Sequence, residues 1–170
     1  MKTDFCIHRG LDPGEYRLED VFSDIRTYDA LRAIFSDAGE LNRVLGETPV
    51  FIVSEPREMF VSNENGSITI GLEHLRRSLK EVLYLDIIHE LCHVKQHLQG
   101  RDLYDPRKSY VDRETEIEAY EVTVREARRI GMNDDAIANY LRVSWITPEE
   151  HKRLAGRLEV LVDAGLIRTF

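Results

Sequence analysis

The stretch His89-Glu90-Leu91-Cys92-His93 decides how this chain is interpreted, because it is an H-E-x-x-H motif. Two histidines four residues apart lie on one face of a helix, so their imidazoles can bind the same metal ion. Glu90 directly follows the first histidine, and at that offset a helical carboxylate can take a proton from a metal-bound water. The motif therefore predicts a metal-binding helix that also carries a general base.

The residues around the motif favour a buried helix. No proline or glycine interrupts them before Gly100, and one set has the 3-4 spacing of an apolar stripe: Leu83, Ile87, Leu91 and Val94. A half-buried helix seldom carries two histidines and a glutamate without a use, so a pair of ordinary surface histidines is the weaker interpretation. We predict one or two helices over residues 72–99, with a break near residues 80–84.

Two histidines need a third protein ligand. Metzincins supply it from H-E-x-x-H-x-x-G-x-x-H, but here Gln96 holds the glycine position and Gln99 the third histidine position, which excludes that family. His97 lies two turns from His89, and a rise of about 1.5 Å per residue puts it too far away for a shared tetrahedral metal. We expect His97 to lie just outside the metal ligands, to form part of the wall of the site, or to lie on the protein surface.

A second helix is predicted over residues 112–130, ending at Gly131. Four glutamates in eight residues would usually form a solvated face, but Glu114, Glu118 and Glu121 flank the apolar stripe. Carboxylates at this spacing repel one another unless a cation lies between them. A metal ion would relieve the repulsion, and so would Arg113, Arg125 or water.

An H-E-x-x-H helix followed by a glutamate-bearing helix resembles the gluzincin branch of the zincin-like metallopeptidases, and the short chain is similar to the minimal gluzincins. Residues 89–97, H-E-L-C-H-V-K-Q-H, also resemble the H-E-x-x-H-x-x-x-H signature of ImmA/IrrE-type peptidases. Those peptidases carry a downstream E-A-N-x-F-A-like motif whose glutamate binds zinc. Residues 118–123 keep its Glu-Ala and an apolar fifth position, but lack the asparagine and the final alanine.

The resemblance implies a zinc ion (Zn2+) held by His89, His93 and Glu118, with Glu90 as the general base. Glu114 is the alternative third ligand, and in that case Glu118 would orient a histidine. The implied activity is zinc-dependent hydrolysis of a peptide or protein substrate. An oxyanion donor is also expected, and the candidates are Tyr110, Tyr120 and His97.

The fold class expected is α+β and zincin-like, with a small antiparallel or mixed sheet beside the two helices and a single domain over residues 1–170. Strands are predicted at residues 50–54, 59–62 and 67–70, the last two joined by a hairpin at Asn65-Gly66. The resemblance implies that residues 67–70 form an edge strand for substrate. Residues 15–45 are expected to be helical.

Residues from about 132 to 170 are expected to form a helical C-terminal extension. Asn133 or Asp134 would cap a helix that runs to Leu141, and Thr147 would begin another over about 148–163. A tail follows over residues 165–170. Trp145 would either anchor this helical cap or form a wall of the substrate cleft.

The composition excludes several classes of function. The net charge is −8 and the sequence pI about 5.3, which disfavours binding to nucleic acid or anionic membranes. No apolar run approaches a membrane span, and no signal-peptide core is visible, so a cytoplasmic location is expected. With only Cys6 and Cys92 present, no disulfide framework is predicted.

A second functional class fits the same residues. A metal-bound sensor or protein-interaction domain would keep the ligands but close the cleft, with either the N-terminal segment or the C-terminal helices. Peptide deformylase also uses H-E-x-x-H, but the cysteine ligand of its E-G-C-L-like motif is absent here. The fourth metal position separates an enzyme, which keeps water there, from a latent site closed by a side chain.

Overall fold

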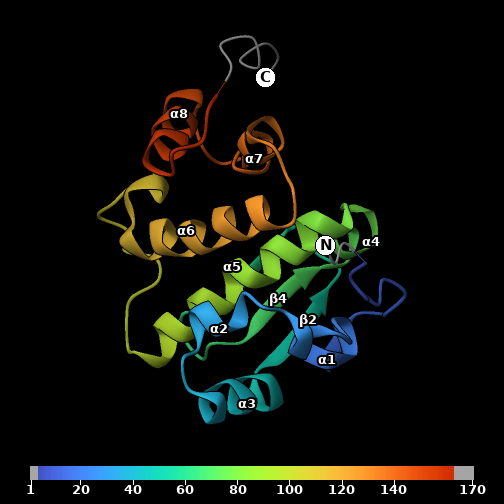
Figure 1. Ribbon diagram of the computed structural model, residues 1–170. Helices are drawn as coiled ribbons and strands as arrows, with labels where there is room; N and C mark the ends of the chain where they lie inside the picture. Colours follow the sequence, from blue (N-terminus) through green and yellow to red (C-terminus); the bar gives the residue numbers. More distant parts are fainter. Residues whose placement is uncertain (1–3, 163–170) are drawn as a thin grey trace.

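The computed structural model describes residues 4–162 and has an α+β fold. Its central element is the long helix α5 (Lys80–Leu98), which lies between a small sheet and helix α6 (Glu114–Arg129) (Figure 1). Because both sides of α5 are covered, Leu83, Ile87 and Leu91 are fully buried. Burial of each such side chain contributes about 1.5–3 kcal/mol to stability.

The sheet has four strands in the order β1-β2-β4-β3 and is mixed. The strands are β1 (Gly14–Arg17), β2 (Pro49–Val53), β3 (Met59–Val61) and β4 (Ile68–Gly71). β2 pairs antiparallel with β1 and parallel with β4, while β3 and β4 form an antiparallel hairpin. The α+β class and the small mixed sheet agree with the prediction.

The predicted hairpin is present, but the prediction of its edge strand is wrong. Gly66 adopts a φ of +73° in the turn, and Ser62 N–H donates to the Ser67 carbonyl at 2.8 Å. β4 lies inside the sheet because β2, which precedes the hairpin in sequence, pairs along its other side. The exposed edge next to α5 is therefore β3.

The N-terminal region also differs from the helical region predicted over residues 15–45. It contains β1 and then short helices, with bounds α1 (Leu18–Val21), η1 (Ile25–Thr27), α2 (Leu31–Ile34) and α3 (Ala38–Glu47). Aspartates interrupt the helical pattern by bonding to nearby backbone and side-chain groups. Asp24 accepts from Cys6 N–H at 3.2 Å and from the Tyr28 hydroxyl at 2.9 Å, and Asp37 caps α3.

Helix α4 (Leu72–Arg77) precedes α5, and the break between them falls at residues 78–79, slightly before the predicted position. η2 (Tyr110–Asp112) then leads into α6. Among the residues that the structure describes, no helix combines the length and the hydrophobicity needed to cross a lipid bilayer.

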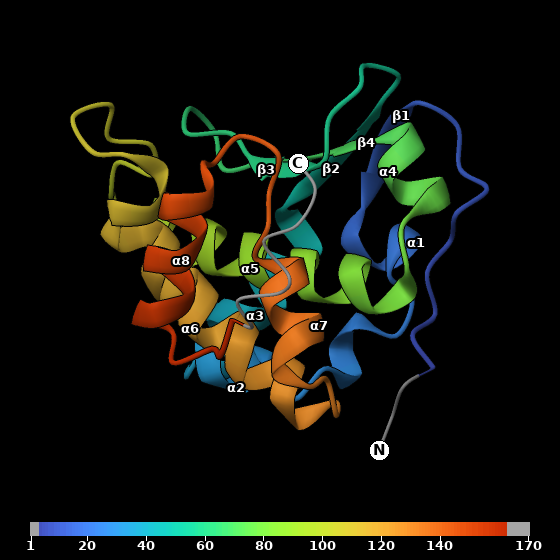
Figure 2. The same ribbon diagram turned by 90° about the horizontal axis from the view of Figure 1, so that it is seen from above.

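Two helices complete the described chain and lie beside α6 and α5 (Figure 2). α7 (Asp134–Tyr140) is capped by Asn133, and α8 (Pro148–Arg157) begins with a capping box between Thr147 and Glu150, both as predicted. α8 ends earlier than predicted, because Val160 N–H turns back to the Ala155 carbonyl at 2.9 Å. The predicted tail, residues 165–170, lies outside the described residues.

Gly71, at the end of β4, provides a test of this arrangement. A Cβ at this position would lie only 1.9 Å from the Arg57 carbonyl oxygen. We expect Gly71→Ala to reduce the free energy of unfolding by about 1–3 kcal/mol or more, because rigid backbone would have to move. Urea denaturation measures this change.

Gly46 is the matched control, because it lies in helix α3 and a Cβ there would meet nothing within 4 Å. Gly46→Ala should leave stability unchanged or raise it by up to about 1 kcal/mol. Equal stability of Gly71→Ala and the wild type would contradict the close approach of β4 to Arg57.

Candidate metal centre

The candidate centre lies where the N-terminal turn of α6 meets the middle of α5. His89 and His93 are one turn apart on α5, and Glu116 faces them from α6. All three side chains are buried, with 5%, 2% and 2% of their surface exposed, respectively. Glu116 lies on the face of α6 that packs on α5, because the buried Ala119 and Tyr120 follow it at 3-4 spacing.

Three potential ligand atoms converge at this point. His89 Nε2 and His93 Nε2 are 3.1 Å apart, and Glu116 Oε2 lies 3.1 Å from the first and 3.3 Å from the second. In a tetrahedral site with bonds of about 2.0–2.1 Å, neighbouring ligand atoms are about 3.3 Å apart. The buried His-His-Glu group could therefore hold a metal ion without rearrangement of its ligand atoms.

The charges of the group are strongly coupled. Burial disfavours a charged imidazole, but the hydrogen bond and charge of Glu116 outweigh it and raise the pKa of His93 to about 9. Burial lowers the pKa of His89. Burial would raise the pKa of Glu116, but its bonds to the two histidines lower it well below the usual range. A proton on His93 thus partly balances the negative charge of Glu116, and a divalent cation could take the place of that proton.

The structure does not bring the predicted third ligand, Glu118, into this group. Glu118 is half-exposed and pairs with Arg101 Nη2 at 3.1 Å, and the alternative ligand, Glu114, pairs with Lys108 at 3.1 Å on the surface. The reason is helical phase: residues two positions apart point in nearly opposite directions around a helix. The 3-4 spacing of Glu116 with Ala119 and Tyr120 is the sequence signal that identifies the inward face.

Glu90 lies beside the group and is only 6% exposed. Its pKa is raised to about 8, chiefly by burial, while the charge of His93 and a backbone hydrogen bond from Val61 act in the opposite direction. Oε2 of Glu90 has no hydrogen-bond partner among the described residues. A buried carboxylate oxygen without a partner is costly, and a substrate or water molecule would satisfy it.

Two cavities, of about 280 and 390 Å³, meet at the group. They share lining from β3, α5, the loop before α6 and the α7–α8 connection, namely Glu58, Met59, His89, Glu90, Tyr110 and Trp145. His93 and Glu116 face the larger cavity, together with Phe60, Tyr104 and Arg113. Trp145, which is 51% exposed, thus forms part of the wall, one of the two roles considered for it.

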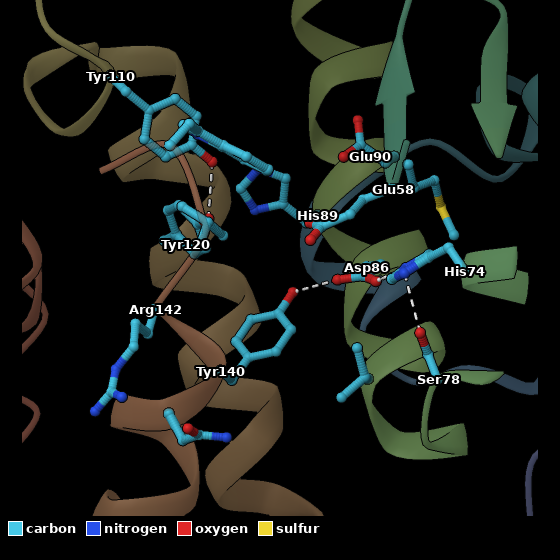
Figure 3. A pocket seen from close by; sticks show the side chains of 15 residues that line it. Glu58, His74, Ser78, Asp86, His89, Glu90, Tyr110, Tyr120, Tyr140 and Arg142 are labelled. Carbon is cyan, nitrogen blue, oxygen red and sulfur yellow. Dashed lines mark hydrogen bonds and ion pairs between the residues drawn. The ribbon is translucent and has the colours of Figure 1, made fainter. Parts of the chain in front are cut away.

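The smaller cavity is bordered by a polar network that connects three helices (Figure 3). Asp86 of α5 accepts from the Tyr140 hydroxyl of α7 at 2.9 Å and pairs with His74 of α4 at 2.7 Å. Ser78 Oγ lies 3.0 Å from the other ring nitrogen of His74. These three contacts join Tyr140, Asp86, His74 and Ser78 in one chain, so hydrogen bonds hold this wall of the cavity in place.

Two of the three predicted oxyanion donors lie in the cleft. The hydroxyls of Tyr110 and Tyr120 are 2.8 Å apart (Figure 3), and the Tyr120 ring lies 4.3 Å from the His89 ring. His97 is instead packed against the hairpin: a Cβ on Gly66 would lie 2.6 Å from its ring. His97 lines a separate cavity on the hairpin side of α5 and does not line either of the two cavities at the His-His-Glu group.

Comparison of the chain with models of protein families, with curated proteins and with solved structures finds no match. Among the described residues, the His-His-Glu group is the one cluster of potential ligands whose atoms converge closely enough for a metal ion. The metal and the reaction are therefore inferred from the geometry of this group and its surroundings.

Substitution of Glu116 and of Glu118 distinguishes the observed group from the ligand set that the family resemblance implies. Glu116→Ala removes a converging ligand atom and should weaken metal binding by more than 100-fold. Glu118→Ala removes the ion pair with Arg101 and one of the two acceptors of the Gln96 amide, and because Glu118 touches no ligand atom it should change the affinity by less than about tenfold. Competition against a chromophoric chelator measures both affinities, and a larger loss in Glu118→Ala would restore the original assignment.

The His74–Asp86 pair predicts a pH-dependent contribution to stability. Burial works to lower the pKa of His74, but the hydrogen bond and charge of Asp86 outweigh it and raise the pKa above 6.5. The stabilisation should be complete below about pH 6.5 and be lost as the pH rises through the folded-state pKa. The difference in unfolding free energy between wild type and His74→Gln should therefore shrink from pH 5.5 to pH 9. A difference that stays constant would show that the charge of His74 contributes nothing.

Proposed function

We propose that this protein is a zincin-like, zinc-dependent metallopeptidase that hydrolyses peptide bonds. The observation that carries the proposal is the convergence of His89, His93 and Glu116 beside the partnerless carboxylate oxygen of Glu90, at the junction of two cavities. Two imidazoles and one carboxylate form the ligand set of several catalytic zinc sites. The H-E-x-x-H motif supplies three of these four residues.

The donor set fits zinc. Its three ligand atoms, two nitrogens and one oxygen, are spaced 3.1–3.3 Å apart, close to the separation expected around a small tetrahedral ion. A set of three protein ligands also leaves a fourth position for water. When bound, zinc would supply Lewis acidity, which lowers the pKa of water and polarises a carbonyl group.

Glu90 would act as the general base and then as the general acid. Its carboxylate lines both cavities, so it can take a proton from an attacking water and pass it to the leaving amine. The backbone of Val61 on β3 lies close to this carboxylate and favours its charged form. The hydroxyls of Tyr110 and Tyr120 are the candidates to donate to the oxyanion of the substrate, since both line the smaller cavity.

The substrate would bind along the edge of β3. In the β3–β4 ladder, hydrogen-bonded positions alternate, and Glu58 and Ser62 bond towards β4. The backbone of Val61 therefore faces outwards, where the Tyr104 hydroxyl donates to its carbonyl at 2.6 Å and the Glu90 carboxylate lies close by. Met59 is the outward residue that remains, and it lines both cavities, so an extended peptide can pair with its backbone.

A metal-bound sensor or interaction domain is the second candidate. The feature that favours it is the low exposure of the ligands, 2–5%, beneath a wall formed partly by Arg142, Val143 and Trp145. If this α7–α8 connection stays closed over the cleft, the group would bind metal without turnover. The two candidates share the metal site but differ in the role of Glu90.

Glu90→Gln tests the enzymatic role. The amide keeps the shape of the side chain but cannot accept the proton, so hydrolysis of a peptide library should fall by about 10²-fold or more, with zinc content unchanged. Glu121→Gln, an exposed glutamate on α6, is the control and should retain full activity. Cleavage by Glu90→Gln at the wild-type rate would contradict the proposal, and absence of cleavage by the zinc-loaded wild type would favour the sensor.

A further inference from the structure

Gln96 connects the two helices that carry the potential ligands. It lies on α5, one turn after His93, and only 4% of its surface is exposed. Its amide oxygen is 2.7 Å from His93 Nδ1. Its amide nitrogen donates to the Thr115 carbonyl at 2.9 Å and to the Glu118 carboxylate at 3.1 Å. All three polar contacts of this amide reach the centre or the start of α6.

These contacts permit only one orientation of the amide. The Thr115 carbonyl and the Glu118 carboxylate can only accept hydrogen bonds, so the NH₂ group of Gln96 must face them. The amide oxygen is then fixed against His93. A flipped amide would place its oxygen against two acceptors and lose both hydrogen bonds.

The fixed amide determines which tautomer the neutral His93 ring adopts. Because the amide oxygen is an acceptor, Nδ1 of His93 must carry a hydrogen and donate it. In the neutral imidazole, Nε2 then has the lone pair, and this is the atom that lies 3.1 Å from His89 Nε2 and 3.3 Å from Glu116 Oε2. A hydrogen bond to the second ring nitrogen is the usual means of orienting a metal-binding histidine.

The same amide also holds the start of α6. Thr115 immediately precedes Glu116, so a bond to its carbonyl fixes the peptide next to the third ligand. The Thr115 hydroxyl donates to the Leu103 carbonyl at 2.9 Å, which holds this turn from the other side. Glu118, which pairs with Arg101, is in turn kept in place as the second acceptor for Gln96.

We propose that Gln96 is a positioning residue that sets the tautomer of His93 and the register of the Glu116 turn for a single metal ion. Glu118 acts through Gln96, as an acceptor that prevents the amide from flipping, and touches no ligand itself. The inference rests on the metal site of the proposed function, but not on peptide hydrolysis.

The test compares zinc affinities by chelator competition in the full-length protein. Gln96→Leu keeps the size of the side chain but removes all three contacts, and should weaken zinc binding by about 10–100-fold. Gln99→Leu is the matched control, because Gln99 is an exposed glutamine at the end of the same helix and should leave the affinity unchanged. Thermal unfolding of each zinc-free variant checks that the fold persists.

A rescue experiment separates positioning from general packing. Gln96→Glu can still accept from His93 but places a carboxylate against Glu118, so zinc affinity should fall. Adding Glu118→Gln restores a donor–acceptor pair and should recover part of the loss, whereas Glu118→Gln alone should change the affinity by less than the Gln96→Glu variant does. In ¹⁵N-histidine NMR of the zinc-loaded protein, the Nδ1–H signal of His93 should persist in the rescued variant.

The outcomes are distinguishable. Wild-type zinc affinity in folded Gln96→Leu, an equal loss in Gln99→Leu, or absence of rescue would overturn the role of Gln96 while leaving the metal site intact. If the wild type binds no zinc, the metal site and this inference both fail. If zinc binding follows the expected order but no peptide is cleaved, the positioning role stands and the peptidase proposal fails.

Discussion

The packing of α6 across α5 is the constraint on which the rest of the structure depends. It buries two imidazoles and a carboxylate together, away from water. Isolated charges in such a position would cost several kcal/mol each, so the three groups are stable there only because they are partners of one another. Their ligand atoms have the spacing expected around a small tetrahedral ion, so binding of a metal ion there would depend directly on the packing of the two helices.

The hairpin of β3 and β4 brings the edge of the sheet next to the candidate site on α5. Its Asn-Gly turn and the close approach of Gly71 to Arg57 accompany the packing of β3 against α5, where the Val61 carbonyl accepts from the Tyr104 hydroxyl and the Val61 backbone lies close to Glu90. One edge strand therefore orients the candidate base and also offers backbone groups to an extended ligand. Because these contacts are backbone ones, they depend on strand register more than on side-chain identity.

The C-terminal helices form part of the site. Arg153 and Arg157 of α8 both pair with Asp112 at 2.8 Å, which ties α8 to the turn that presents Tyr110. Tyr140 of α7 bonds to Asp86 on α5, and Trp145 packs edge-on against Tyr110 with ring centroids 5.6 Å apart. The wall of the cleft thus depends on the packing of α7 and α8, so their movement would change access to the His-His-Glu group.

Local signals in the sequence determined much of this protein: the motif helix, the hairpin turn and the caps at Asn133 and Thr147, because each depends on residues within one or two turns of chain. Tertiary structure alone decided which glutamate faces the histidines and which strand forms the edge. Glu116 points inwards because the small and apolar face of α6 packs on α5, and β3 is the edge strand because β2 pairs with the other side of β4. The 3-4 spacing of Glu116 with Ala119 and Tyr120 marks one face of α6, but only the packing of that face on α5 brings Glu116 to the histidines. The pairing of β2 with β4 likewise joins segments that are separated in the sequence.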